Sequence, residues 1–130
     1  MARFGAISTI FVTIGLIAAT AARADDIDQI ARDIDQSGKL VVAAFKMTDT
    51  EEIAAQRRQL IAMYPRFHAI GSTDDPRLAA CSKAHQALLD VIYALDAKSA
   101  ARGLLAFEEA AATFDDQLVD CKTKPRRPRR

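Results

Sequence analysis

Apolar residues recur three and four positions apart in four segments of the chain, which is the spacing of one face of an α-helix. In the first segment, from about residue 26 to residue 47, the apolar stripe is interrupted only at Ser37 and Gly38. Gly38 could break the helix or sit at a close contact between helices. We predict one continuous helix, because the stripe keeps its phase across the gap. The stripe consists of Ile27, Ile30, Ile34, Val41 and Phe45.

The second segment follows a turn at residues 48–52 and ends near Pro65. Thr48 with Glu51 and Asp49 with Glu52 both have the spacing of a helix-capping box. Pro65 is expected to end or kink the helix, because proline lacks the backbone N–H. The predicted apolar face carries Ile53, Leu60, Ile61 and Tyr64.

The third and fourth segments have the most regular patterns. Asp75 followed by Pro76 is typical of a helix start, and this helix is expected to end near Asp96. Ser99 could cap the last helix. The third stripe consists of Leu78, Cys81, His85, Leu88, Ile92 and Leu95. The fourth consists of Leu104, Phe107, Ala111, Phe114, Leu118 and Cys121.

Four stripes joined by short links predict an all-α protein, a small up-and-down antiparallel bundle of four helices. Three longer helices and a loop are the alternative if Pro65 shortens the second helix. We expect a single bundle domain over residues 25–121, because so short a chain builds one modest core.

The first 24 residues have the layout of a cleavable signal peptide. Arg3 is followed by an uncharged, mostly apolar stretch, and Ala22-Arg23-Ala24 has the form of a cleavage site before Asp25. A membrane anchor is the alternative, but an apolar run of about 17 residues is near the lower limit for spanning a bilayer. We therefore predict an exported protein, in the bacterial periplasm, with no stable membrane span after cleavage.

Charge is distributed unevenly along the chain. All 17 acidic residues and 10 of the basic ones lie in residues 25–121, which gives that segment a net charge of −7. Residues 122–130 form a short tail with two prolines and six positive charges, which we predict to be disordered. The charged tail residues are Lys122, Lys124, Arg126, Arg127, Arg129 and Arg130.

The two cysteines are predicted to form one disulfide. Cys81 lies near the start of the third helix and Cys121 at the end of the fourth, so a hairpin that turns near residues 98–101 places them opposite each other. An exported protein meets oxidising conditions in which such a bond persists. The pair is 40 residues apart and lacks the Cys-x-x-Cys form, so we do not expect redox catalysis.

His85 lies one turn after Cys81 on the inward stripe, a spacing that metal ligands can also have. A metal would need two further ligands, and His68 is the only other histidine. We interpret His85 as a core histidine that hydrogen-bonds to a backbone carbonyl or a carboxylate. We predict no metal and no cofactor, with a b-type haem site as the weaker alternative.

Four arginines near the second helix and the loop after it could contact an acidic partner or an anionic ligand. Ion pairs with carboxylates of the same domain are the competing interpretation. These residues are Arg57, Arg58, Arg66 and Arg77.

The sequence contains no catalytic motif, so we predict a non-enzymatic binding or accessory protein. The bundle would act as a scaffold, and the basic tail would contact a protein or an anionic envelope surface. The tail has no aromatic residue that could stack on bases, so no nucleic acid is expected. The alternatives are an acid-stress or holdase chaperone and an immunity-type inhibitor.

Overall fold

The computed structural model describes residues 8–71, 75–95 and 100–123, with side chains described in 25–71, 75–95 and 105–123. Every element in this part of the chain is an α-helix. The helices are α1 (Ser8–Lys46), α2 (Thr50–Ala62), α3 (Tyr64–Ile70), α4 (Pro76–Leu95) and α5 (Ala100–Lys122).

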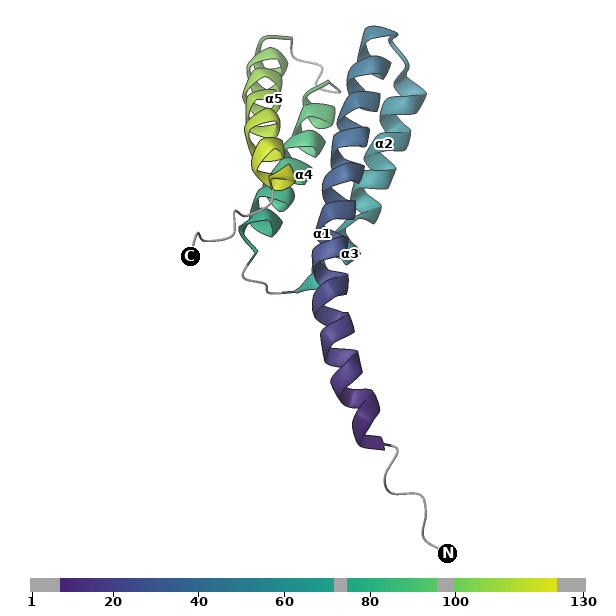
Figure 1. Cartoon of the computed structure of the whole chain (residues 1–130). Helices are drawn as coiled ribbons and strands as arrows, with labels where there is room; N and C mark the ends of the chain where they lie inside the picture. Colours follow the sequence, from purple (N-terminus) through teal and green to yellow (C-terminus); the bar gives the residue numbers. More distant parts are fainter. Residues whose placement is uncertain (1–7, 72–74, 96–99, 124–130) are drawn as a thin grey trace, which may run out of the picture.

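The four long helices run alternately up and down, and α3 is a single short helix that follows α2 (Figure 1). Helix α1 packs on α2, α4 and α5, and α2 also packs on α4. The most extensive contact joins α4 and α5, so the chain forms two antiparallel hairpins. The predicted all-α bundle is confirmed.

Helix α1 runs without a break through Gly38, as the phase of its stripe predicts. A Cβ atom at Gly38 would lie only 2.7 Å from Cζ of Phe114 on α5, so the missing side chain allows a close helix contact. Ile27, Ile30 and Ile34 are buried as expected. Phe45 is not, because its side chain is 53% exposed near the end of α1.

The beginning of α1 extends beyond the rest of the bundle (Figure 1). Among residues whose side chains are described, Ile27 is the first that belongs to the core. The described core residues thus begin just after the predicted cleavage site.

Helix α2 starts as the capping pattern predicts, since Asp49 accepts a hydrogen bond from the backbone N–H of Glu52 at 3.1 Å. It ends at Ala62, and Met63 joins it to α3, whose first turn contains Pro65. Two residues of the predicted apolar face, Ile61 and Tyr64, are instead 46% and 42% exposed. Tyr64 leaves the stripe because it belongs to α3.

Polar side chains also tie α1 to α2 in the interior. The hydroxyl of Ser37 donates to Oε1 of Gln56 at 2.8 Å, and Nε2 of Gln56 donates to Glu52 at 2.7 Å. Both Ser37 and Gln56 are buried, so these bonds replace the water that each group loses.

Helix α4 is the central helix of the core. Its start is capped by Asp75, whose Oδ1 accepts the backbone N–H of Arg77 at 3.0 Å. Its predicted stripe is buried at Cys81, His85, Leu88 and Ile92. By contrast, Phe107, Phe114 and Leu118 of α5 are only partly buried, because α5 lies mainly against one neighbour.

Cys81 and Cys121 form the predicted disulfide, with both residues fully buried and their Cα atoms 4.6 Å apart. The bond ties the first part of α4 to the end of α5. A crosslink that closes a loop of 40 residues stabilises a protein by about 4 kcal/mol in the chain-entropy model. That is a large share of the ~5–15 kcal/mol by which small domains are stable.

Replacement of Gly38 by alanine tests the contact between α1 and α5. Alanine is more favourable than glycine inside a helix by about 1 kcal/mol. At position 38, however, its Cβ would collide with the ring of Phe114. Overpacking costs about 1–3 kcal/mol, so we expect Gly38→Ala to lower the free energy of unfolding, measured in urea. In a Phe114→Ala background the same change should raise it by about 1 kcal/mol. An equal effect in both backgrounds would contradict the predicted contact.

Candidate functional site

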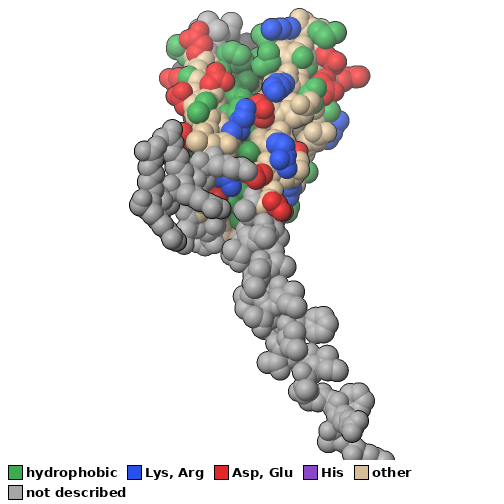
Figure 2. Space-filling model, viewed as in Figure 1, with side chains coloured by type: hydrophobic (Ala, Val, Ile, Leu, Met, Phe, Trp, Pro, Cys, Tyr) green, Lys and Arg blue, Asp and Glu red, His purple; other side chains and the backbone are tan. Residues whose placement is uncertain are grey.

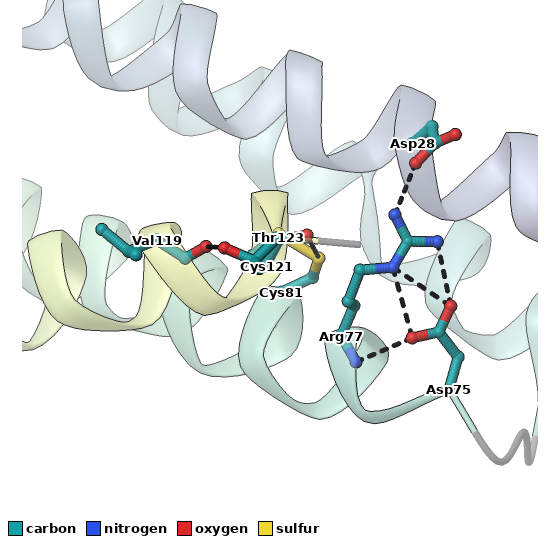
Figure 3. Close-up of a disulfide and its surroundings, with 7 residues drawn as sticks. All are labelled: Asp28, Asp75, Arg77, Cys81, Val119, Cys121 and Thr123. Atoms are coloured by element: carbon teal, nitrogen blue, oxygen red, sulfur yellow. Dashed lines mark hydrogen bonds and ion pairs between the residues drawn. A yellow bond between two sulfur atoms is a disulfide. The ribbon is translucent and has the colours of Figure 1, made fainter. Parts of the chain in front are cut away.

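Arg77 is held between two carboxylates at the start of α4 (Figure 3). Its side chain is 6% exposed. Nη1 donates to Asp28 of α1 at 2.5 Å, and Nη2 donates to Asp75 at 2.9 Å. Nε also donates to the Asp75 carboxylate, at 3.1 and 3.2 Å. The arginine therefore braces α1 against the beginning of α4, one turn from the disulfide.

These contacts change the acid–base properties of the group. The hydrogen bond from Arg77 lowers the pKa of Asp75 and outweighs the opposing effect of burial. The same bond raises the pKa of Arg77 above its ordinary value. Both residues are therefore charged throughout the physiological range, which suits a structural ion pair.

The other three candidate arginines are spread over α2 and α3. Nη1 of Arg66 pairs with Asp33 of α1 at 2.7 Å, with both side chains 39% exposed. Arg58 is exposed on α2. Arg57 is half-buried and is engaged in an interaction of its own. It also lines a hollow of about 390 Å³, to which Phe45 and Ile92 contribute as well. The structure does not gather the four arginines into one site.

The base of the basic tail is held against α1. Nζ of Lys122 pairs with Asp35 at 3.3 Å, and Lys39 pairs with the same carboxylate at 3.4 Å. The hydroxyl of Thr123 donates to the carbonyl of Val119 at 2.6 Å (Figure 3). Tail residues 124–130, with five of the six predicted charges, lie outside the described residues, as does Ser99.

Figure 2 shows that basic and acidic side chains lie interspersed on this face of the bundle. The ion pairs of Arg66 and Lys122 with acidic residues of α1 account for part of this mixing. The described part of the bundle thus presents a mixed-charge surface on this side.

His85 is 2% exposed and lies beneath two aromatic rings. Its ring packs edge-on against Tyr64 with centroids 4.8 Å apart, and Phe67 lies at 5.2 Å. Nε2 donates a hydrogen bond to the carbonyl of Leu60, as the interpretation of a core histidine predicted. Burial lowers the pKa of His85 and outweighs the opposing hydrogen bond to Leu60. The ring is therefore neutral at pH 7.

A cleft of about 660 Å³ opens between α3 and α4 above this histidine. Tyr64 and Phe67 contribute its aromatic lining, and His85 contributes to the lining from α4. Polar groups of Asp75, Ser82 and Gln86 complete it together with His68, which is exposed. The volume is in the range of small-molecule sites in proteins.

Sequence reasoning singled out His85 but missed the two rings beside it. Tyr64 was interpreted as part of the core face of α2, and Phe67 lies in a segment for which no helix was predicted. The aromatic spacing of three residues in Tyr64-Pro-Arg-Phe67 was the available signal. The interpretation that the arginines pair with carboxylates of the same domain is confirmed for Arg66 and Arg77, but the sequence did not identify Asp33 and Asp28, which are 33 and 49 residues away in the chain. The nearer partner of Arg77, Asp75, was interpreted only as a helix cap.

Comparisons of the chain with protein-family models, with curated proteins and with solved structures gave no match. None of the described helices is both long and apolar enough to cross a membrane. A disulfide is compatible with an exported protein.

Replacement of Arg77 by methionine tests the brace. It would leave the carboxylates of Asp28 and Asp75 without their cation, and breaking a buried ion pair costs about 3–5 kcal/mol. We expect the free energy of unfolding at pH 7, measured in urea, to fall by that amount. Arg58→Met, at an exposed position, should change it by less than about 0.5 kcal/mol.

The difference in the free energy of unfolding between the original protein and Arg77→Met should depend on pH. The lowered pKa of Asp75 means that its ion pair stabilises the protein above the unfolded value of about 3.9. This contribution is lost as the pH falls through the folded pKa. The difference in the free energy of unfolding between the original protein and Arg77→Met should therefore decrease as the pH is lowered from 5 to 2. A gap that stays constant over this range would show that Arg77 acts through packing alone.

Proposed function

We propose that this chain is an exported, periplasmic, non-enzymatic binding protein whose basic C-terminal tail contacts an anionic partner or surface. The disulfide-linked bundle serves as a rigid scaffold that presents the tail. The observation that supports this best is the attachment of the tail at Cys121 and Lys122, where the disulfide and the pair with Asp35 fix its origin.

The arrangement of the other arginines adds support. Arg66 and Arg77 are engaged by aspartates of the same chain, so their charges are partly or wholly offset within the bundle. The tail adds five basic residues within the last seven positions, with no acidic residue among them. A concentrated charge of this kind is attracted to anionic surfaces by about 1 kcal/mol for each basic residue.

The proposal predicts strong, salt-sensitive binding to vesicles that contain anionic phosphatidylglycerol. A chain that ends at Thr123 lacks five tail charges and keeps both the disulfide and Lys122. We expect it to bind at least 100-fold more weakly at low salt, in a sedimentation assay with vesicles. Such a loss corresponds to about 2.7 kcal/mol, well within the attraction of five charges.

Two controls make this experiment decisive. Arg58→Gln removes an exposed bundle charge and should change vesicle binding by less than threefold. Vesicles of zwitterionic lipid alone should bind neither form. Affinity capture with the same two chains tests an acidic protein as the partner: capture that the truncated chain retains at high salt would overturn the role of the tail.

A second candidate function, an acid-stress holdase, is favoured by exposed apolar side chains where α1 ends and α5 begins. Val42, Phe45 and Leu105 are each more than half exposed there, and Met47 is 79% exposed. The rings of Phe45 and Phe107 lie 5.9 Å apart and join the two helices. Exposed apolar surface is what a holdase offers to an unfolded client.

The holdase candidate predicts more exposed apolar surface in acid. The fluorescence of a dye that binds such surface should rise severalfold between pH 7 and pH 3, and the protein should suppress client aggregation at pH 3. Phe45→Gln should at least halve that protection, whereas Tyr93→Gln, at an exposed position of α4, should not. Dye fluorescence that stays flat over this range would remove the candidate.

A further inference from the structure

A groove of about 770 Å³ runs along the surface between α4 and α5, the two helices that make the most extensive contact in the bundle. Its lining is mostly apolar and includes small side chains, which are Ala87, Ala94, Ala106 and Ala110. Tyr93 of α4, which is 51% exposed, adds an aromatic ring. The charged residues of the lining are Lys83, Asp90 and Glu109. The groove can therefore hold a chain segment that carries charge.

The face of α5 at this groove is acidic. Glu109 and Thr113 line the groove, and Asp116 and Asp120 continue the same helix face, because the four positions are spaced by four, three and four residues. The three acidic side chains are exposed, and none of them forms an ion pair or a side-chain hydrogen bond with another described residue. The sequence between positions 103 and 121 contains no basic residue that could offset them.

The basic tail leaves α5 at one end of this face. The backbone N–H of Thr123 still donates to the carbonyl of Val119, at 3.1 Å, so the chain keeps its helical direction up to this point. Residues 124–130 follow, with five positive charges and two prolines. Proline favours the extended polyproline conformation, in which seven residues span about 22 Å. An α-helix of about 14 residues has the same length, so the tail can reach back from Thr123 to the level of Glu109.

The charges of the tail and of α5 coincide in this arrangement. One extended residue covers about two residues of helix, because the rise per residue is about 3.1 Å against 1.5 Å. The tail lysine then lies level with Asp120, the arginines at 126 and 127 lie level with Asp116, and the last arginine lies level with Glu109. Lys83 opposes this contact, but together with Asp90 the groove and the acidic face carry four carboxylates against one lysine.

We infer that the groove between α4 and α5, together with the acidic face formed by Glu109, Asp116 and Asp120, is the docking site for tail residues 124–130 of the same chain. The tail is tethered at the end of its own groove, so its effective concentration there is in the millimolar range and exceeds that of the tail of a second molecule. The docking needs no partner. It therefore goes beyond the proposed function, and the two can fail separately.

The docking is tested by ¹H–¹⁵N spectra of the full chain and of a chain that ends at Thr123, at low salt. We expect the amide resonances of Ala110, Thr113 and Asp116 to differ between the two chains, although these residues are far from the point of truncation. The differences should fall at least threefold at high salt, because salt screens contacts between exposed charges. Differences confined to the last turn of α5 would overturn the inference. Differences that grow with protein concentration would assign the groove to the tail of a second copy, and would overturn it as well.

A matched pair of variants tests which face of α5 is used. Glu109→Gln/Asp116→Asn removes two charges from the acidic face. Glu108→Gln/Asp115→Asn makes the same two changes one position earlier, on another face of the helix, and neither residue lines the groove. We expect the first variant to reduce the difference at Thr113 between full and truncated chains at least threefold, and the second to reduce it by less than a third. Equal reductions would overturn the assignment to the groove.

Docking also predicts competition between the groove and an anionic surface, and this consequence alone rests on the proposed function. Both variants have the same net charge, but only Glu109→Gln/Asp116→Asn releases the tail. It should therefore bind phosphatidylglycerol vesicles at least threefold more tightly than Glu108→Gln/Asp115→Asn at low salt. Equal binding would overturn the competition. If neither variant nor the original protein binds vesicles, the proposed function fails, and the spectra decide the docking by themselves.

Discussion

The first two turns of α4 are linked to α1 by an ion pair and to α5 by the disulfide, and the bundle depends on these two links. Arg77 reaches across to Asp28 near the start of the folded part of α1. Cys81, one turn later, is bonded to Cys121 at the end of α5. α5 packs mainly on α4 and less extensively on α1, so the disulfide secures its main interface. The buried ion pair also fixes the position of α1 along α4, because it forms only when Asp28 and Arg77 lie next to each other.

Both candidate binding features are placed by this same helix. The disulfide fixes the end of α5, from which the basic tail continues. One turn beyond Cys81, His85 contributes to the wall of the cleft that α3 completes. The two features differ in chemistry, since the tail is cationic and the cleft is lined by acceptors and aromatic rings.

Much of the fold could be predicted because helical periodicity is a local property. The stripe of α4, the cap at Asp75 and the break before Pro65 each depend on neighbours within a few positions. The disulfide could be predicted as well, because hairpin register relates positions 81 and 121. The predictions for Phe45, Ile61 and Tyr64 were wrong, because a stripe says which face is apolar but not how far the neighbouring helices extend to cover it.

Pattern and spacing along the chain settled the all-α class, the caps at Asp49 and Asp75 and the cysteine pair, since each follows from local geometry or from a single hairpin. They did not settle where α1 begins, which is Ser8 and not residue 26 as predicted. Packing settled the rest. Whether Arg66 and Arg77 would face a partner or an aspartate of the same chain depended on contacts 33 and 49 residues apart. The cleft depends on α3, a separate helix after α2 that places Tyr64 and Phe67 beside His85. No local pattern encodes such a meeting, because it depends on where separate helices lie in space.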